Sequence, residues 1–149
     1  MEAAQAQAFL NLGREVLAQQ AFSVLVGAEL VALRPGHCEL AVDVRDELKQ
    51  QHGFAHGGVV SYLADNALTY AGGTAMQVPV VTSEFKINYV RPATGQRLVA
   101  RADAVHVSKS QAVCRCEVFA ITDGTEKLVA LAQGTIARLG DGSAQAAAA

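Results

Sequence analysis

Residues 57–76 read GGVVSYLADNALTYAGGTAM and form the longest periodic stretch of the chain. Their apolar side chains recur at intervals of three and four residues, as on one face of a helix, and many of them are small. This spacing predicts an apolar α-helix from Gly57 to about Met76 that is slim and about 30 Å long. The pair Gly72-Gly73 marks the point where the helix is expected to fray or stop.

Strand-like segments lie on both sides of this helix. After it come four β-prone runs separated by turn-forming residues: 80–90, 97–107, 111–121 and 127–139. Before it, residues 21–33 and 37–44 are also β-prone, and Arg34-Pro35-Gly36 between them predicts a hairpin turn. Residues 3–20 have helical spacing and predict a short amphipathic helix, while residues 45–55 are polar and predict a loop.

Strands joined by short turns pair in antiparallel fashion, and an apolar helix among them must be covered by the apolar face of their sheet. The expected fold class is therefore α+β, with a long central helix wrapped by a curved antiparallel sheet of five to six strands and a short N-terminal helix. The length of 149 residues favours one domain, which we place at residues 1–139. Residues 140–149 are small and are expected to form a disordered tail.

Composition limits the partners. The net charge is −2, with 12 basic and 14 acidic residues and no Lys/Arg run, so nucleic acid is a poor candidate. The three cysteines are too few for a disulfide framework or a metal site and favour packing thiols in a reducing compartment. Without a basic leader or a long apolar stretch, the sequence predicts a cytoplasmic protein with no membrane partner.

Asp65 is a carboxylate within the apolar helix, where an ionised group without partners costs several kcal/mol. Asn66 and Thr69 bring polar atoms to the same region, and Thr69 shares one side of the helix with Asp65. A catalytic carboxylate explains this placement. A solvated stripe, or an Asp held by Thr69 for structural reasons alone, explains it as well.

His56-Gly57-Gly58 precedes the helix. A helix start carries unpaired N–H groups and partial positive charge, so it can bind an anion or polarise a carbonyl, and glycine allows close approach. A tight turn at the helix entry needs the same residues. Gly57 and Asp65 are about 12 Å apart along the axis and cannot serve one carbonyl within one chain. Two antiparallel helices across a two-fold axis would bring them together, so a shared site requires a dimer.

Two segments together carry a resemblance. They are residues 50–67, QQHGFAHGGVVSYLADNA, and residues 88–93, NYVRPA. Both resemble the hotdog-fold thioesterases of the phenylacetate-degradation (PaaI-like) group, and the similarity extends from about Val24 to Leu139. The resemblance implies an acyl-CoA thioesterase that acts as a homo-oligomer, either a dimer or a tetramer of two dimers, with shared active sites.

The resemblance also implies roles for single residues. Asp65 matches the catalytic carboxylate, which acts as general base or as nucleophile. Gly57 matches the donor of a backbone N–H to the thioester carbonyl, and Gln50 matches the side-chain amide that assists there. Thr69 matches a Thr that helps to position water in some members, and Thr82 matches a Ser or Thr used in others. Simple strand alternation, however, places Thr82 on the face that carries Glu84, Lys86 and Asn88.

Further residues are expected to contact substrate. Those around the helix start and its next turns are His56, Gly58 and Asn66. Arg91 and Lys109 lie in turns, where they can meet the CoA phosphates or remain solvated surface charges. The acyl end is expected against Phe54, Leu68 and Tyr70, without a defined acyl length. CoA is part of the substrate, so no separate cofactor and no metal are expected.

Two alternatives remain at this point. A hotdog dehydratase or hydratase pairs a catalytic His with a carboxylate, but His56 is followed by Gly-Gly rather than the Phe-Pro of acyl-carrier-protein dehydratases. A non-catalytic acyl-CoA sensor would lack the carboxylate or carry a DNA-binding extension. Asp65 and the single short N-terminal helix count against the sensor.

Overall fold

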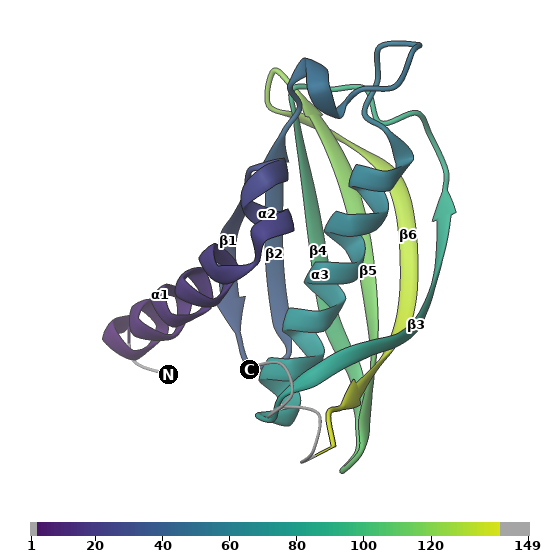
Figure 1. Cartoon of the computed structure of the whole chain (residues 1–149). Coiled ribbons are helices and arrows are strands. Elements are labelled where there is room, and N and C mark those ends of the chain that lie inside the picture. The colour runs from purple at the N-terminus through teal and green to yellow at the C-terminus, as the bar shows by residue number, and fades with distance from the viewer. Residues whose placement is uncertain (1–2, 141–149) are drawn as a thin grey trace.

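The computed structural model describes residues 3–140, which form one antiparallel sheet curved around one long helix (Figure 1). The helices are α1 (Ala3–Gln19), α2 (Ala21–Val26) and α3 (Gly57–Met76), with a short 3-10 helix, η1, at Asp46–Leu48. The strands are β1 (Ala28–Arg34), β2 (His37–Asp43), β3 (Val80–Tyr89), β4 (Arg97–Val107), β5 (Gln111–Thr122) and β6 (Thr125–Arg138). The predicted α+β fold is confirmed. The tail expected over residues 140–149 lies, except for Gly140, outside the described residues.

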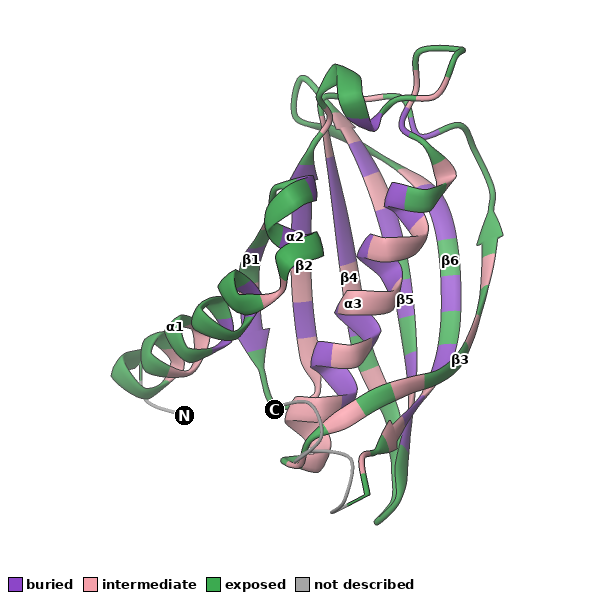
Figure 2. Cartoon of the chain, in the orientation of Figure 1, coloured by how far each residue is buried: buried purple, intermediate pink, exposed green. Residues whose placement is uncertain are grey.

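The sheet has the order β1-β2-β4-β5-β6-β3, and all neighbouring strands pair antiparallel. Strands β1 and β3 are therefore its two edges. Along β5 and β6 buried and exposed residues largely alternate (Figure 2), because one face packs on α3 and the other meets solvent. Within residues 3–140, no helix combines the length and apolarity needed to cross a membrane.

Helix α3 has the predicted bounds, and its small residues let the sheet approach closely. Leu63, Ala64, Ala67 and Leu68 are all 0% exposed. A Cβ on Gly72 would lie 2.7 Å from Cβ of Ile136 on β6, closer than real Cβ contacts. The prediction that Gly72-Gly73 ends the helix is wrong. These glycines serve close packing. Helix α3 ends at Met76, and its C-cap Gln77 has a left-handed φ of 55°.

The strand expected over residues 21–33 is wrong in its first half. Residues 21–26 form α2, and Gly27, with a φ of 75°, ends this helix before β1 begins. Buried Ser23 explains the difference, since its hydroxyl accepts a 2.6 Å hydrogen bond from Tyr62 of α3 and donates one of 2.6 Å to Gln20. The hydrogen bond from Tyr62 is a tertiary contact and the one to Gln20 is local, and together they outweigh the β-propensity of the apolar residues around Ser23.

The three cysteines are free and lie in the core, as predicted. Cys114 and Cys116 share the inner face of β5 and are 0% and 2% exposed. Burial disfavours the thiolate, which raises the pKa of Cys114 to about 11 and that of Cys116 to about 12. Burial also raises the pKa of Cys38 well above its ordinary value.

We expect a chromogenic disulfide reagent at pH 8 to modify these thiols only after the protein unfolds, because both access to the sulfur and thiolate formation are suppressed. Rapid modification of all three thiols in the native protein would contradict their burial.

The raised pKa values also predict a pH dependence of stability. The folded pKa values of Cys114 and Cys116 exceed the ordinary 9.0, so the contribution of these two thiols to the free energy of unfolding is complete below pH 9.0 and is lost as the pH rises toward 11 and 12. Urea unfolding should therefore show a lower stability at pH 10 than at pH 8.

Candidate active site

Asp65 lies at the centre of a small hydrogen-bonded cluster between α3 and β3. The hydroxyl of Thr82 donates a 2.6 Å hydrogen bond to Oδ1 of Asp65. Thr69, one helical turn after Asp65, has its Oγ1 2.9 Å from Thr82 Oγ1 and 2.9 Å from the backbone carbonyl oxygen of Asp65, to which it donates. The carboxylate is thus held on the side of α3 that faces β3, and it keeps partial access to solvent.

A β-bulge brings Thr82 to this cluster. The pairing of β3 with β6 shifts register between Thr82 and Glu84. Because of this extra residue, Thr82 lies on the face toward α3, while Glu84, Lys86 and Asn88 are exposed. The expectation that Thr82 shares a face with those three residues is therefore wrong. Of the predicted site residues, Asp65, Thr69 and Thr82 are directly hydrogen-bonded to one another.

Asn66 does not join them. Its amide donates to Oε1 of Gln20 at 3.0 Å and to the hydroxyl of Tyr62 at 3.1 Å, and it lies 3.4 Å from the hydroxyl of Ser23. The expectation that Asn66 shares the region of Asp65 is wrong for this reason, although Asn66 lines a groove between α1 and α3. Its contacts are structural and hold α2 against α3.

The start of α3 has an accessible N–H group. His56 is the N-cap, and its Nδ1 accepts a 2.9 Å hydrogen bond from the N–H of Gly58. A Cβ on Gly58 would lie 2.9 Å from that Nδ1, so a larger residue there would displace the His56 ring. The N–H of Gly57, by contrast, has no acceptor among residues 3–140. It is the first amide of a 20-residue helix and carries the positive end of the helix dipole.

Tyr89 belongs to the segment 88–93 that resembles the PaaI-like group, and the resemblance implies no role for it. Its hydroxyl donates a 3.2 Å hydrogen bond to the carbonyl of Gly57 and also contacts the hydroxyl of Ser61. The Tyr89 ring lies 3.6 Å from the place where a Cβ of Gly57 would stand. Tyr89 therefore braces the helix start from the end of β3.

A small cavity of about 190 Å³ opens beside Gly57, between the helix start and the end of β3. Phe54 and Arg91 line it, as does Tyr89. Gln50 belongs to the preceding loop, where its N–H donates to the carbonyl of Phe54 at 3.0 Å. Its side-chain oxygen accepts from the N–H of His52, which leaves the side-chain NH₂ without an acceptor in the described part of the chain. Gln50 can therefore offer a side-chain N–H donor.

The remaining predicted contacts are dispersed. Leu68 is 0% exposed and belongs to the core, so the expectation that it touches substrate is wrong. Arg91 lies near the helix start, where its Nη1 donates to the carbonyl of Leu128 at 2.8 Å. Lys109 lies in the β4–β5 turn, at the opposite end of the sheet. One nucleotide cannot contact both Arg91 and Lys109 within one chain.

The sequence comparisons agree with this geometry. The sequence model of the family described as Thioesterase superfamily matches residues 52–127, which include the helix start, Asp65 and Thr82. The chain belongs to the thioesterase superfamily. It is a thioester hydrolase with the hotdog fold, and its resemblance to the PaaI-like group is confirmed.

Relatives of this thioesterase have similar length and shape. A 1,4-dihydroxy-2-naphthoyl-CoA hydrolase from Listeria monocytogenes is 31% identical over 114 residues, which are 75% of this chain and 90% of the relative. A thioesterase family protein from Silicibacter pomeroyi superposes with a TM-score of 0.81 at 36% identity, covering 85% of this chain and 96% of the other. A mutant of the phenylacetic acid degradation protein PaaI from Thermus thermophilus gives a TM-score of 0.70 at 38% identity, covering 79% and 98%.

Proposed function

We propose that this thioesterase hydrolyses acyl-CoA to the free acid and CoA, with Asp65 as general base or nucleophile and a Gly57 N–H group polarising the thioester carbonyl. The observation that carries the proposal is the Asp65 carboxylate, fixed by Thr82 at 2.6 Å and the one charged side chain of α3. The relative from Listeria monocytogenes, by its name, acts on a CoA thioester. CoA is then part of the substrate, and no separate cofactor or metal is needed for this chemistry.

Each active site is proposed to combine two subunits. Asp65 lies eight residues after Gly57 on one helix, which is about 12 Å along the axis and too far for one carbonyl. Strand β3 is a sheet edge next to Asp65, and Val81, Tyr89 and Val90 are 48%, 53% and 45% exposed on or just beyond it. Pairing of two β3 edges would extend the sheet and cover these residues. It would also set Gly57 of the partner subunit near Asp65, in a dimer or in a tetramer of two dimers.

The proposed chemistry follows from the charges. Attack on the thioester carbon moves negative charge onto the carbonyl oxygen, which the N–H of Gly57 stabilises together with the helix dipole and the amide of Gln50. Asp65 either removes a proton from the attacking water or attacks the carbon itself to form an anhydride that water then opens. In both routes the C–S bond breaks, and the CoA sulfur leaves as a thiolate that takes up a proton.

A panel of acyl-CoA substrates tests the proposal, with the released CoA thiol measured by a chromogenic disulfide reagent. Release that depends on enzyme concentration is expected for at least one aryl or medium-chain acyl-CoA. Binding of acyl-CoA without release would favour the sensor. Hydration of an enoyl-CoA without thiol release would favour the hydratase.

The three free thiols also support a cytosolic location, which fractionation of cells can check.

Thr82→Val is expected to reduce turnover by about 10-fold to 100-fold, because a hydrogen bond to a charged group contributes roughly 1.5–3 kcal/mol and valine retains the size of threonine. Initial rates with the best acyl-CoA measure it. Thr135→Val is the matched control, since Thr135 lies on the adjacent strand β6 and donates to Glu84 on the other face. Equal losses in both variants would show that the Thr82–Asp65 bond is not specifically required.

A further inference from the structure

A second, larger groove lies between α1 and the second half of α3, and it has an unusual lining. Its volume is about 700 Å³, within the roughly 300–1,000 Å³ of small-molecule sites. Phe9, Leu12 and Val16 of α1 line one side, and Tyr70 of α3 lies across from them. None of the residues that line the groove carries a charge.

Helix α1 is fixed in place along the other side of its axis. Gly13 is buried, and a Cβ there would lie 2.5 Å from Cδ2 of Leu33 on β1. The hydroxyl of Tyr70 donates a 2.9 Å hydrogen bond to the carbonyl of Gly13. Leu12 and Val16 nevertheless remain 58% and 46% exposed toward the groove. Apolar side chains held in this way on an anchored helix are typical of a binding surface.

The groove reaches the catalytic cluster through Thr69. This residue is part of the groove lining, and its Oγ1 lies 2.9 Å from that of Thr82, which donates to Asp65. A molecule in the groove would therefore have one end at the hydroxyls that position Asp65. Continuity with the reacting group distinguishes this groove from the other hollows of the molecule.

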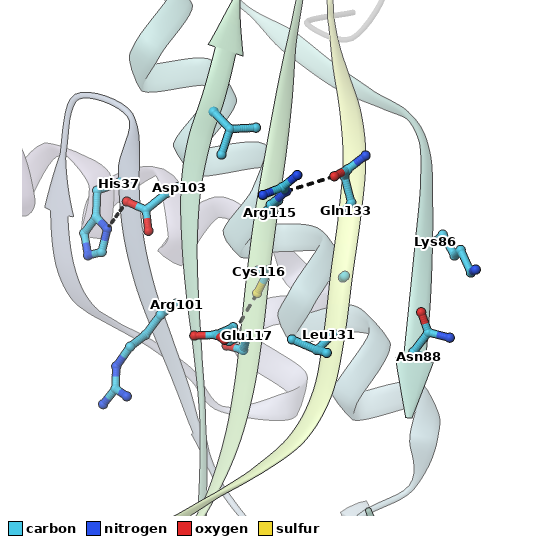
Figure 3. Close-up of a pocket in the computed structure, with 12 residues that line it drawn as sticks. His37, Lys86, Asn88, Arg101, Asp103, Arg115, Cys116, Glu117, Leu131 and Gln133 are labelled. Atoms are coloured by element: carbon cyan, nitrogen blue, oxygen red, sulfur yellow. Dashed lines mark hydrogen bonds and ion pairs between the residues drawn. The ribbon is translucent and has the colours of Figure 1, made fainter. Parts of the chain in front are cut away.

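Those other hollows have different chemistry. The hollow on the outer face of the sheet (Figure 3) has about 560 Å³ and a lining rich in charge: His37, Lys86, Arg101, Asp103, Arg115 and Glu117. It lies on the face opposite to α3, away from Asp65. The cavity beside Gly57 holds about 190 Å³ and contains Arg91. The lining of the α1–α3 groove is uncharged, with the apolar side chains of α1 on one side and polar residues such as Gln20, Thr74 and Gln77 elsewhere. It therefore suits an uncharged group, and the acyl chain is the part of an acyl-CoA with that chemistry.

We propose that the α1–α3 groove binds the acyl group, and that Leu12 and Val16 form the wall that selects bulky aryl or medium-chain acyl groups over acetyl. This inference rests on the proposed function and adds the place where the acyl group binds and the residues that select it. Burial of an acyl chain against Leu12, Val16 and Tyr70 provides binding energy that a two-carbon group cannot obtain, because that energy grows with each buried CH₂. Selectivity is then a property of α1, which lies outside the residues 52–127 that the family model matches.

Filling the groove tests the proposal. Leu12→Trp is expected to lower kcat/KM for octanoyl-CoA and phenylacetyl-CoA by about 10-fold or more, and to leave acetyl-CoA within about two-fold. Val16→Phe should act in the same direction. Leu25→Trp is the matched control, because Leu25 is 68% exposed on α2 and outside the groove lining. An equal loss for acetyl-CoA and octanoyl-CoA, or no loss in either variant, would overturn the proposal.

Binding of the product acids separates this inference from the proposed function. Titration calorimetry with octanoate, phenylacetate and acetate needs no turnover. Wild-type protein should bind octanoate and phenylacetate but not acetate, and Leu12→Trp should weaken both by about 10-fold. If the acids bind in this way while no acyl-CoA is hydrolysed, the proposed function fails and the groove assignment holds. If acyl-CoA is hydrolysed with no dependence on Leu12 or Val16, the groove assignment fails alone.

Discussion

Asp65→Asn should abolish thioester hydrolysis, with a loss in kcat of about 10³-fold, within the range that a positioned acid or base contributes. The substitution keeps the volume of the side chain, and Oδ1 can still accept the hydrogen bond that Thr82 donates at 2.6 Å. What disappears is the basic oxygen that takes a proton from water or attacks the carbon. We expect the variant to keep its fold, its oligomeric state and its affinity for acyl-CoA. Thiol release measures the loss of turnover, and light scattering measures the oligomeric state.

Glu84→Gln is the control for loss of one negative charge. Glu84 follows Thr82 by two residues on β3, but the bulge turns it to the exposed face, where Thr135 donates to it. It should retain wild-type turnover. A comparable loss in the two variants, or near-normal turnover in Asp65→Asn, would remove Asp65 from the mechanism. Single-turnover hydrolysis in ¹⁸O-labelled water separates the two routes, because only an anhydride that water opens at the Asp65 carbonyl leaves solvent oxygen in the Asp65 side chain and yields a product acid without ¹⁸O.

The larger elements of the fold were predictable because each depends on local pattern. The helix at Gly57–Met76 and the strand at Arg97–Val107 have the predicted bounds, since long periodic segments between turn residues leave few alternatives. Helix α2 was missed because its apolar residues are β-prone and its stability comes from a hydrogen bond between Ser23 and Tyr62, 39 residues away. Gly72-Gly73 was misread for the same reason. Its function is the close contact with Ile136 on β6, which no local pattern indicates.

The candidate site was predictable in composition but not in geometry. Spacing along one helix correctly put Thr69 on the side of Asp65. The role of Thr82 depends on a one-residue bulge, and such a bulge reverses every later side chain of the strand without a signal in the alternation itself. Asn66 looked equivalent to Thr69 in sequence but lies on the side of α3 that faces α2. Tyr89 was visible in the quoted motif, but only its contact with Gly57 gives it a role.

Gly57→Pro should reduce kcat by about 10²–10³-fold, the loss seen when one oxyanion donor is removed. Proline deletes the N–H that would polarise the carbonyl, and Gly57 occupies the first helical position, where proline is well tolerated. The preceding residue, His56, already has a ψ of 138°, in the range that residues before proline adopt. The N–H has no acceptor within residues 3–140, so folding should not depend on it. Circular dichroism and thiol release measure the two properties separately.

Gly57→Ala is the control that distinguishes the effect of losing the N–H from the effect of adding a side-chain carbon. Both substitutions place a Cβ 3.6 Å from the Tyr89 ring, an ordinary contact, but alanine keeps the N–H donor and should keep most of the activity.

Mixing subunits of two inactive variants tests whether the active site is shared between subunits. Dimers formed from Asp65→Asn and Gly57→Pro subunits would pair an intact Gly57 with an intact Asp65 in one of their two sites. Refolding an equal mixture should recover about a quarter of wild-type activity, because half of the dimers are mixed. A site contained within one chain has no intact copy in any such mixture, so the activity would stay at the level of the two parent variants.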